Sequence, residues 1–325
     1  IRSWLYLKIE IGSNEAGQRL DKFLRKLLKD VPLSAIFKAL RKGDVRVNGK
    51  KQKEKYILQE EDVVEIKYIQ TKKETKEKFI KVNSSALRIT YEDENIVIVE
   101  KWPGVLVHPD GNKKEATLTD YVLSYLFAKG DYMPENEVTF TPAACNRLDR
   151  NTSGIVIFGK NFEALRILNE TIREGEVEKY YNTLVKGRIK DGLYKGYILK
   201  NEETNISKVY EKKVPGSKEI AMEVKTLKSN GAFSFLEINL ITGRSHQIRA
   251  HLSHLGNPVL GDTKYGDRKL NSYFNNKFGL EYQYLYAYKL IFRGVGGKLE
   301  YLKNKTIAQS LPPIFKKIKV EAFKF

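Results

Sequence analysis

Residues 146–158 read NRLDRNTSGIVIF, a polar loop that runs directly into an apolar stretch. The loop places the carboxylate of Asp149 between Arg147 and Arg150, and residues 155–158 predict a buried strand. Two neighbouring cations favour the ionised form of a carboxylate, so Asp149 is a candidate for chemistry. A structural aspartate that pairs within its own loop is the alternative, because structural ion pairs are common. Other parts of the chain favour the first interpretation.

The composition is typical of a globular protein. The chain has 325 residues, 41% of them hydrophobic and 30% charged, which is enough for roughly two domains with apolar cores. No apolar run approaches the roughly 20 residues of a membrane span, and the N-terminus lacks a signal-peptide pattern. Cys145 is the single cysteine, which excludes an internal disulfide and fits a reducing compartment. We therefore expect a cytoplasmic protein with no membrane partner.

The charge balance points to a polyanionic partner. Lys and Arg number 58 against 40 Asp and Glu, a formal net charge of +18. Such an excess predicts binding to nucleic acid or to an anionic membrane surface, with a solvated basic surface as the alternative. The positions of the cations favour RNA.

Residues 15–68 have the pattern of two helices that lead into a hairpin. Ser34 is the expected N-cap of the second helix and Gly43 its end. Val45 and Val47 alternate with polar residues before a tight-turn pair at 48–49, and the second strand is expected to end near residues 62–66. The apolar stripe of the first helix consists of Leu20, Phe23, Leu24, Leu27 and Leu28.

The segments EAGQRLDKFL (15–24) and LRKGDVRVNG (40–49) resemble the αL RNA-binding domain. The resemblance implies that residues 12–70 form this domain and grip structured RNA through its backbone and shape. Residues 71–85 are polar and predict a linker to a second domain at 86–325. The cations expected to contact RNA here are Arg19, Lys38, Arg41, Lys42 and Arg46.

The second domain alternates predicted strands and helices. Residues 96–99 predict a buried strand, 118–127 and 162–172 predict helices, and 236–240 predict a half-buried strand. Lys179 and Tyr181 stand two residues apart on another predicted strand, so both face the same side. Residues 242–252 read TGRSHQIRAHL, a turn that opens a helix. Ile248, Leu252 and Leu255 form the buried stripe of that helix, and Arg249 lies beside it.

These segments, in this order, resemble the RluA-type RNA pseudouridine synthases over nearly the whole chain. The motifs are RLDRNTSG at 147–154 and GRSHQIR at 243–249, and GDTKYGDR at 261–268 brings the chain closest to the RluC branch, which modifies large-subunit ribosomal RNA. The resemblance implies an α+β fold whose catalytic domain is a mixed, mainly antiparallel sheet with flanking helices and a central cleft. The departures are Asn146, where the family usually has His, and Trp102, inserted where a Lys-Pro pair is common.

The resemblance also implies roles for individual residues. Asp149 is expected to be the catalytic nucleophile, Tyr181 to stack on the target base, and Arg249 to pair with the Asp149 carboxylate. The residues of this domain that we expect to contact RNA are Arg147, Arg244, His246 and Lys179.

The reaction itself calls for no cofactor. Isomerisation of uridine to pseudouridine changes no oxidation state and loses no group, and the chain lacks the dinucleotide and phosphate-loop fingerprints. His246, His251 and His254 are close in sequence, but no cysteine or suitable acid accompanies them, so we expect packing roles and no metal. Cys145 is expected to be a small core residue.

Two other functions remain open at this point. A ribosomal RNA-binding or assembly protein without activity would keep the basic domain, and a carboxylate-dependent RNA hydrolase would need a second acid or a metal. No heptad or apolar surface repeat predicts assembly, so we expect a monomer that binds RNA, with no DNA partner.

Overall fold

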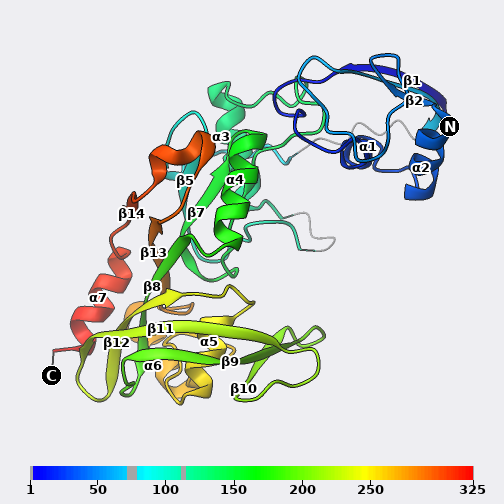
Figure 1. Ribbon diagram of the computed structural model, residues 1–325. Helices are drawn as coiled ribbons and strands as arrows, with labels where there is room; N and C mark the ends of the chain where they lie inside the picture. Colours follow the sequence, from blue (N-terminus) through cyan, green and yellow to red (C-terminus); the bar gives the residue numbers. More distant parts are fainter. Residues whose placement is uncertain (1–2, 72–78, 111–114, 325) are drawn as a thin grey trace.

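The computed structural model describes residues 3–71, 79–110 and 115–324. Figure 1 shows a small N-terminal domain at one end and a long sheet domain whose C-terminal helix lies at the opposite end. The fold class is α+β, as predicted, with a mainly antiparallel mixed sheet in the larger domain. Within these ranges the structure contains no candidate membrane-spanning helix.

The N-terminal domain packs two helices on a sheet with the strand order β1-β3-β2. The apolar stripe predicted for α1 is its core, because Leu20, Phe23 and Leu24 are fully buried. The elements of this domain are β1 (Ser3–Glu10), α1 (Leu20–Leu27), α2 (Leu33–Lys42), β2 (Val45–Val47) and β3 (Val63–Thr71).

Three details of this domain differ from the prediction. Residues 3–10 form β1, which pairs with β3, so the domain begins before the expected residue 12. Ser34 is not the N-cap of α2, because the helix begins at Leu33 and Pro32, two residues before Ser34, is its N-cap. The second hairpin strand, β3, begins rather than ends near Val63. The predicted turn at 48–49 and the helix end at Gly43 are confirmed, each with positive φ.

The larger domain is built on a sheet with the main strand order β10-β9-β11-β12-β8-β13-β7-β5-β4. Two short strands lie outside this order: β14 pairs with β13, and β6 pairs with β7. Among the strands of the described residues, only β13 and β7 run parallel to each other. The strands are β4 (Arg88–Glu92), β5 (Ile96–Lys101), β6 (Ala143–Ala144), β7 (Ser153–Gly159), β8 (Val177–Lys186), β9 (Gly192–Asn201), β10 (Ile206–Tyr210), β11 (Lys218–Ser229), β12 (Phe233–Leu240), β13 (Leu285–Phe292) and β14 (Thr306–Ala308).

Helices cover both faces of the sheet at β5 and β7. Val97 and Phe158 belong to the apolar cluster that contains residues of α3, whereas Ile98 and Ile157 belong to the cluster that contains residues of α4. Burial on both faces explains why these strands read as continuous apolar runs instead of alternating ones. The helices of this domain are α3 (Leu118–Lys129), α4 (Phe162–Arg173), α5 (Gln247–His254), α6 (Arg268–Phe278), α7 (Pro313–Ala322) and the 3₁₀ helix η1 (Gly297–Leu302).

The predicted linker, residues 71–85, is wrong in its second half. Phe79 is buried in the core beside α3. The backbone N–H of Ile80 donates to Asp120 at 2.9 Å, and that of Val82 donates to Ser124 at 3.0 Å. These bonds attach residues 79–82 to one face of α3. Residues 72–78 lie outside the described part of the chain.

Candidate active site

The loop that carries Asp149 is held from two sides. The Oγ1 of Thr152 accepts a hydrogen bond from the side chain of Gln283 at 3.0 Å. The buried ammonium of Lys101 donates to the carbonyls of Trp102, Val105 and Arg150 at 3.1, 2.8 and 2.8 Å. Lys101 therefore ties the Pro-Gly turn after β5 to the residue that follows Asp149.

Gly154 ends this loop at the point where two strands approach closely. It has φ +128°, and a Cβ there would lie 2.3 Å from the carbonyl oxygen of Ala287 on β13. Only glycine fits this backbone position. The parallel contact of β7 with β13 thus depends on the glycine of the motif and fixes where the Asp149 loop leaves the sheet.

A second loop brings Arg249 to the same place. The Oε1 of Gln247 accepts hydrogen bonds from the hydroxyl of Thr242 at 2.8 Å and from the N–H of Arg244 at 3.1 Å. His246 has φ +57° at the start of α5, a strained conformation for a residue other than glycine. This turn between β12 and α5 directs the first turn of the helix toward the Asp149 loop.

Arg249 lies between two carboxylates. Its Nη1 donates to Asp149 at 3.0 Å, while Nε and Nη2 donate to both oxygens of Asp262 at 2.6 and 2.9 Å. Arg249 is 5% exposed and Asp262 0%. A two-pronged pair of this kind fixes the plane of the guanidinium. Asp262 therefore orients Arg249, whose remaining nitrogen faces Asp149, which is the pairing that the family resemblance implies.

The two arginines that flank Asp149 in sequence do not hold its carboxylate as a pair. Arg150 turns away and forms an exposed ion pair with Glu115 at 3.0 Å, whereas Arg147 lines the cavity beside Asp149. The expectation of two flanking cations was wrong because neighbouring side chains in an extended loop point in different directions. The cation that contacts Asp149 comes from 100 residues further along the chain.

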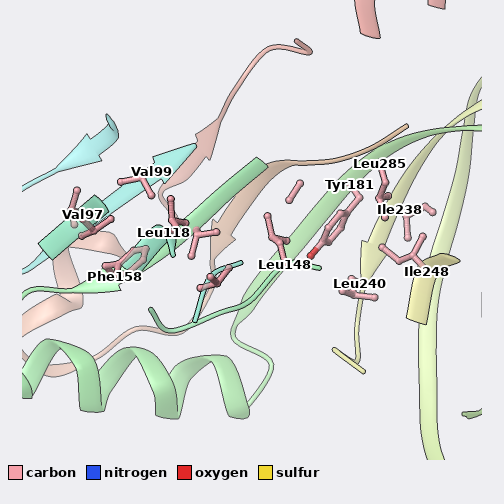
Figure 2. Packing of buried hydrophobic residues seen from close by; sticks show 14 of the residues in the cluster. Val97, Val99, Leu118, Leu148, Phe158, Tyr181, Ile238, Leu240, Ile248 and Leu285 are labelled. Atoms are coloured by element: carbon pink, nitrogen blue, oxygen red, sulfur yellow. The ribbon is translucent and has the colours of Figure 1, made fainter. Parts of the chain in front are cut away.

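Tyr181 closes the inner wall of the site. It lies on β8 between Ile238 and Ala287 of the neighbouring strands. Figure 2 shows its phenol oxygen pointing toward Leu148, the residue before Asp149. Burial, and to a smaller extent the Asp149 carboxylate, raises the pKa of this phenol. Tyr181 therefore keeps its proton at neutral pH.

These side chains surround a cavity of about 230 Å³. Three of the predicted RNA contacts, Arg147, Arg244 and His246, line it, whereas Lys179 does not. Lys179 lies half-buried on β8, and burial lowers its pKa. The lining residues are Arg147, Leu148, Asp149, Thr152, Tyr181, Lys218, Leu240, Gly243, Arg244, Ser245, His246, Gln247, Ile248, Arg249 and Leu285.

A larger cavity of about 570 Å³ lies against Trp102, Asn151 and Phe315. It contains neither Asp149 nor Arg249, and its lining is mainly apolar. The smaller cavity, where a carboxylate, a guanidinium and a phenol meet, is therefore the candidate active site.

Sequence reasoning did not assign a role to Asp262 or Lys101. Asp262 falls within GDTKYGDR, and Lys101 ends the apolar run of β5. The weak signal was a charge directly after Gly261 in one case and a charge at the end of β5 in the other. Neither residue type nor spacing shows that these two charges are fully buried.

Within the described part of the chain, no carboxylate pairs with four of the five cations predicted to bind RNA in the N-terminal domain. Lys38, Arg41 and Lys42 are exposed on α2, and their spacing places them on one side of the helix. Arg46 is exposed on β2 and donates to the carbonyls of Gly43 and Gly49. Arg19 differs, because it pairs with Asp21 at 2.9 Å.

The histidines and the cysteine take part in packing. His246 lies with its Nδ1 2.8 Å from the hydroxyl of Tyr265, and His251 is buried in the sheet-facing side of α5. Among the described residues no group of three or more metal-binding side chains occurs. Burial raises the pKa of the Cys145 thiol to about 12, so this residue stays a protonated thiol beside the α4 cluster.

Known proteins are similar to this chain over most of its length. The RNA pseudouridylate synthase family matches residues 95–254, and the S4 domain matches residues 18–64. Ribosomal large subunit pseudouridine synthase C of Vibrio parahaemolyticus is 34% identical over 292 residues, which cover 88% of each chain. An uncharacterized RNA pseudouridine synthase of Mycoplasma capricolum is 33% identical and covers 93% of this chain and 97% of its own.

A solved structure shows the same fold. Human RNA pseudouridylate synthase domain containing 4 superposes with a TM-score of 0.57 over 72% of this chain and 92% of its own, at 22% identity. The identity and coverage of the bacterial relatives are high enough to show the family as well as the fold. The chain therefore belongs to the RNA pseudouridylate synthase family, whose members are isomerases that convert uridine in RNA into pseudouridine.

Proposed function

We propose that the protein isomerises uridines of large-subunit ribosomal RNA and that Asp149 is the carboxylate that reacts. The substrate class follows the names of the relatives, several of which are ribosomal large subunit pseudouridine synthase C. The observation that carries the role of Asp149 is its contact with Arg249 at 3.0 Å inside the cavity that Tyr181 also lines.

The reaction balances without an added reagent. The N1–C1′ bond of uridine breaks, the uracil rotates, and a C5–C1′ bond forms while C5 loses a proton and N1 gains one. A carboxylate can begin this sequence by attack on the base, by attack on C1′, or by removal of a proton from the sugar. All three routes need an ionised acid in a pocket that shields the base from water.

Arg249 supplies the positive charge that such an acid requires. Burial alone favours the neutral form of a carboxylic acid, and a contacting guanidinium opposes this. Asp262 occupies two of the guanidinium nitrogens, so Arg249 cannot rotate away when RNA enters. We infer that Asp262 is a positioning residue that acts through Arg249.

Tyr181 offers an aromatic face and a phenol hydrogen. A uridine must leave its stack to reach a cavity of this size, and an aromatic ring replaces the lost stacking. Because its pKa is raised, the free enzyme holds the phenol as a hydrogen-bond donor and not as a base. Tyr181 is thus suited to stack on the extruded uracil and to donate to it.

Two groups of polar side chains divide the work of binding RNA. Arg147 and Arg244 line the cavity, where they can contact the phosphates on either side of the extruded nucleotide. His246 also lines it, as a neutral hydrogen-bonding group, because burial lowers its pKa. The exposed cations of α2 lie on the separate S4 domain and can hold structured RNA at a distance from the chemistry. We expect the protein to act as a monomer in the cytoplasm, where its substrate is made.

Release of tritium tests the proposed function. Large-subunit ribosomal RNA labelled with tritium at uridine C5 should lose label to water while the strand stays intact. A binder would release none, and a hydrolase would shorten the strand. Small-subunit ribosomal RNA and transfer RNA, labelled in the same way, should release far less, and equal release from all three would contradict the proposed substrate class.

Substitution of Asp149 tests the role of the carboxylate. Asp149→Asn should lower turnover by on the order of 10⁴-fold, as for a group that reacts directly, with RNA affinity kept within a few-fold. Glu223→Gln, which removes one charge from the exposed face of β11, is the matched control and should keep full turnover. Normal tritium release by Asp149→Asn would remove Asp149 from the mechanism.

A further inference from the structure

The S4 domain is joined to the catalytic domain by hydrogen bonds of Asn14. Its side-chain amide nitrogen donates to both oxygens of Glu137 at 2.9 and 3.1 Å. Its amide oxygen accepts from the backbone N–H of Phe162 at 3.1 Å. One residue of the small domain thus holds two elements of the large one: the loop that follows α3 and the first residue of α4.

Glu15 adds a buried acceptor to the same contact. It is 3% exposed, and its Oε1 accepts from the backbone N–H of Thr139 at 3.0 Å, from that of Phe140 at 3.3 Å and from the Thr139 hydroxyl at 3.4 Å. A buried carboxylate is costly unless donors satisfy it. The donors here all come from the other domain, so separating the domains would leave them without this partner.

Apolar and cationic contacts surround these hydrogen bonds. Val138 of the loop packs against the core of the S4 domain. The ammonium of Lys26 lies 5.2 Å from the centre of the Phe162 ring and donates to Gln18 at 2.9 Å. We call Asn14 and Glu15, together with residues 137–140 and Phe162, the interdomain clasp.

The clasp leads directly to the catalytic loop. After Phe140 the chain forms β6, which pairs with β7. Asn146 then accepts a hydrogen bond from the N–H of Ile157 at 2.8 Å, three residues before Asp149. The segment that holds the S4 domain is therefore itself fixed to the strand that carries the catalytic loop.

We propose that the interdomain clasp determines which uridine is modified, because it holds the basic face of α2 at one orientation relative to the Asp149 cavity. Hydrogen bonds are directional, so the six bonds of two adjacent residues define an angle as well as a contact. RNA gripped by α2 then presents only uridines at a matching position to the cavity. This inference rests on the proposed function and deepens it by naming the source of site selection.

Pseudouridine maps of whole large-subunit ribosomal RNA test the clasp. The Asn14→Ala/Glu15→Ala variant should convert the natural target about tenfold more slowly at limiting enzyme, because the second binding domain no longer acts at a defined position. Other uridines should gain pseudouridine at the same time. A short labelled stem-loop that cannot reach α2 should be converted at the wild-type rate within about twofold.

Two further variants separate site selection from stability. Glu15→Gln keeps an acceptor oxygen for the two backbone N–H groups and should keep the wild-type map. Glu60→Ala removes a charge from the exposed surface of the same domain and should also keep it. X-ray scattering in solution should show a larger radius of gyration for Asn14→Ala/Glu15→Ala than for the other three proteins, with circular dichroism unchanged.

The outcomes distinguish the two proposals. If the wild-type protein releases no tritium from any RNA, the proposed function fails. If it turns over and Asn14→Ala/Glu15→Ala keeps the wild-type map despite a larger radius, the clasp does not select the site. An unchanged radius together with an unchanged map would show that the clasp does not hold the domains, and would overturn the inference as well.

Discussion

The charges at the active site and those on α2 have opposite surroundings. Arg249 is buried between Asp149 and Asp262, and all three side chains lock one another in place. Lys38, Arg41 and Lys42 lie exposed on α2, and no carboxylate contact is seen for them among the described residues. The guanidinium of the first group is neutralised within the protein, and the cations of the second are left for a partner to neutralise.

The difference shows what burial does to a charge. A charge removed from water must be paired, and pairing gives it a fixed position, which chemistry on a single atom requires. An exposed lysine or arginine costs little and stays mobile, which suits attraction to a phosphate backbone that carries no base-specific information. We therefore expect paired charge to serve catalysis and exposed charge to serve RNA affinity.

Removal of Arg249, on the buried side of the comparison, should have the largest effect on stability and turnover. Arg249→Leu leaves two carboxylates without their cation, so the free energy of unfolding should fall by about 3 to 5 kcal/mol. Tritium release should fall by on the order of 10³-fold. Urea unfolding and single-turnover assays measure the two effects.

Arg166→Leu is the matched control, because Arg166 forms an exposed pair with Glu170 on α4. A surface pair of this kind contributes about 0.3 to 0.5 kcal/mol. If both arginine variants lost similar stability, burial would not be what distinguishes the two kinds of charge.

Acid should lower the stability of the folded protein through His251, another titratable group that is buried. Burial, with a smaller contribution from His254, lowers the pKa of His251 from 6.5 to about 4. Between these values the unfolded chain binds a proton that the folded protein does not, so the free energy of unfolding falls as pH drops from 6.5 to 4. The loss should reach about 2 to 3 kcal/mol at pH 4.

His251→Phe should flatten this part of the stability curve, measured by urea unfolding at a series of pH values. His254→Phe changes an exposed histidine of the same helix and should keep most of the slope. A His251→Phe protein with the full wild-type slope would place the titration elsewhere.

RNA binding through the exposed cations of α2 should depend on salt concentration. Arg41→Ala/Lys42→Ala should weaken RNA binding on the order of tenfold at low salt and reduce the slope of log Kd against log salt by about 1.5. Turnover at saturating RNA should not change. Filter binding over a range of salt concentrations measures both quantities.

Lys298→Ala/Lys303→Ala removes two exposed lysines at η1 and serves as the matched control. Equal changes in slope for the two double variants would mean that the cations act through net charge alone. A change confined to the α2 variant would assign the contact to that helix.

Local pattern was enough to predict the elements with the strongest periodicity. The stripes of α1, α3 and α4 follow the helical period, and the turn at 48–49 uses residues that tolerate positive φ. Such signals depend on residues close together in sequence, so they can be recognised without a structure. The cap of α2 was missed because Pro32 and Ser34 both suit a helix start, and only the backbone shows which residue was used.

Contacts between distant residues were predicted only where a motif named them. The pairing of Arg249 with Asp149 follows from the family resemblance, but the two contacts of Asp262 do not. The sequence predicts a linker that includes residues 79–82, although these residues attach to α3. Polar composition does not reveal backbone N–H groups that donate to a helix.

The sequence by itself determined the family, the basic RNA-binding character and the loop that presents Asp149, because residue type and short spacing encode these features. The tertiary structure alone decided that Asp262 orients Arg249, that Arg150 turns away to Glu115, and that Glu15 holds the two domains together. Each of these depends on which charges become buried beside which donors. That is set by the packing of strands and loops more than ten residues apart, and the order of residues along one segment does not contain it.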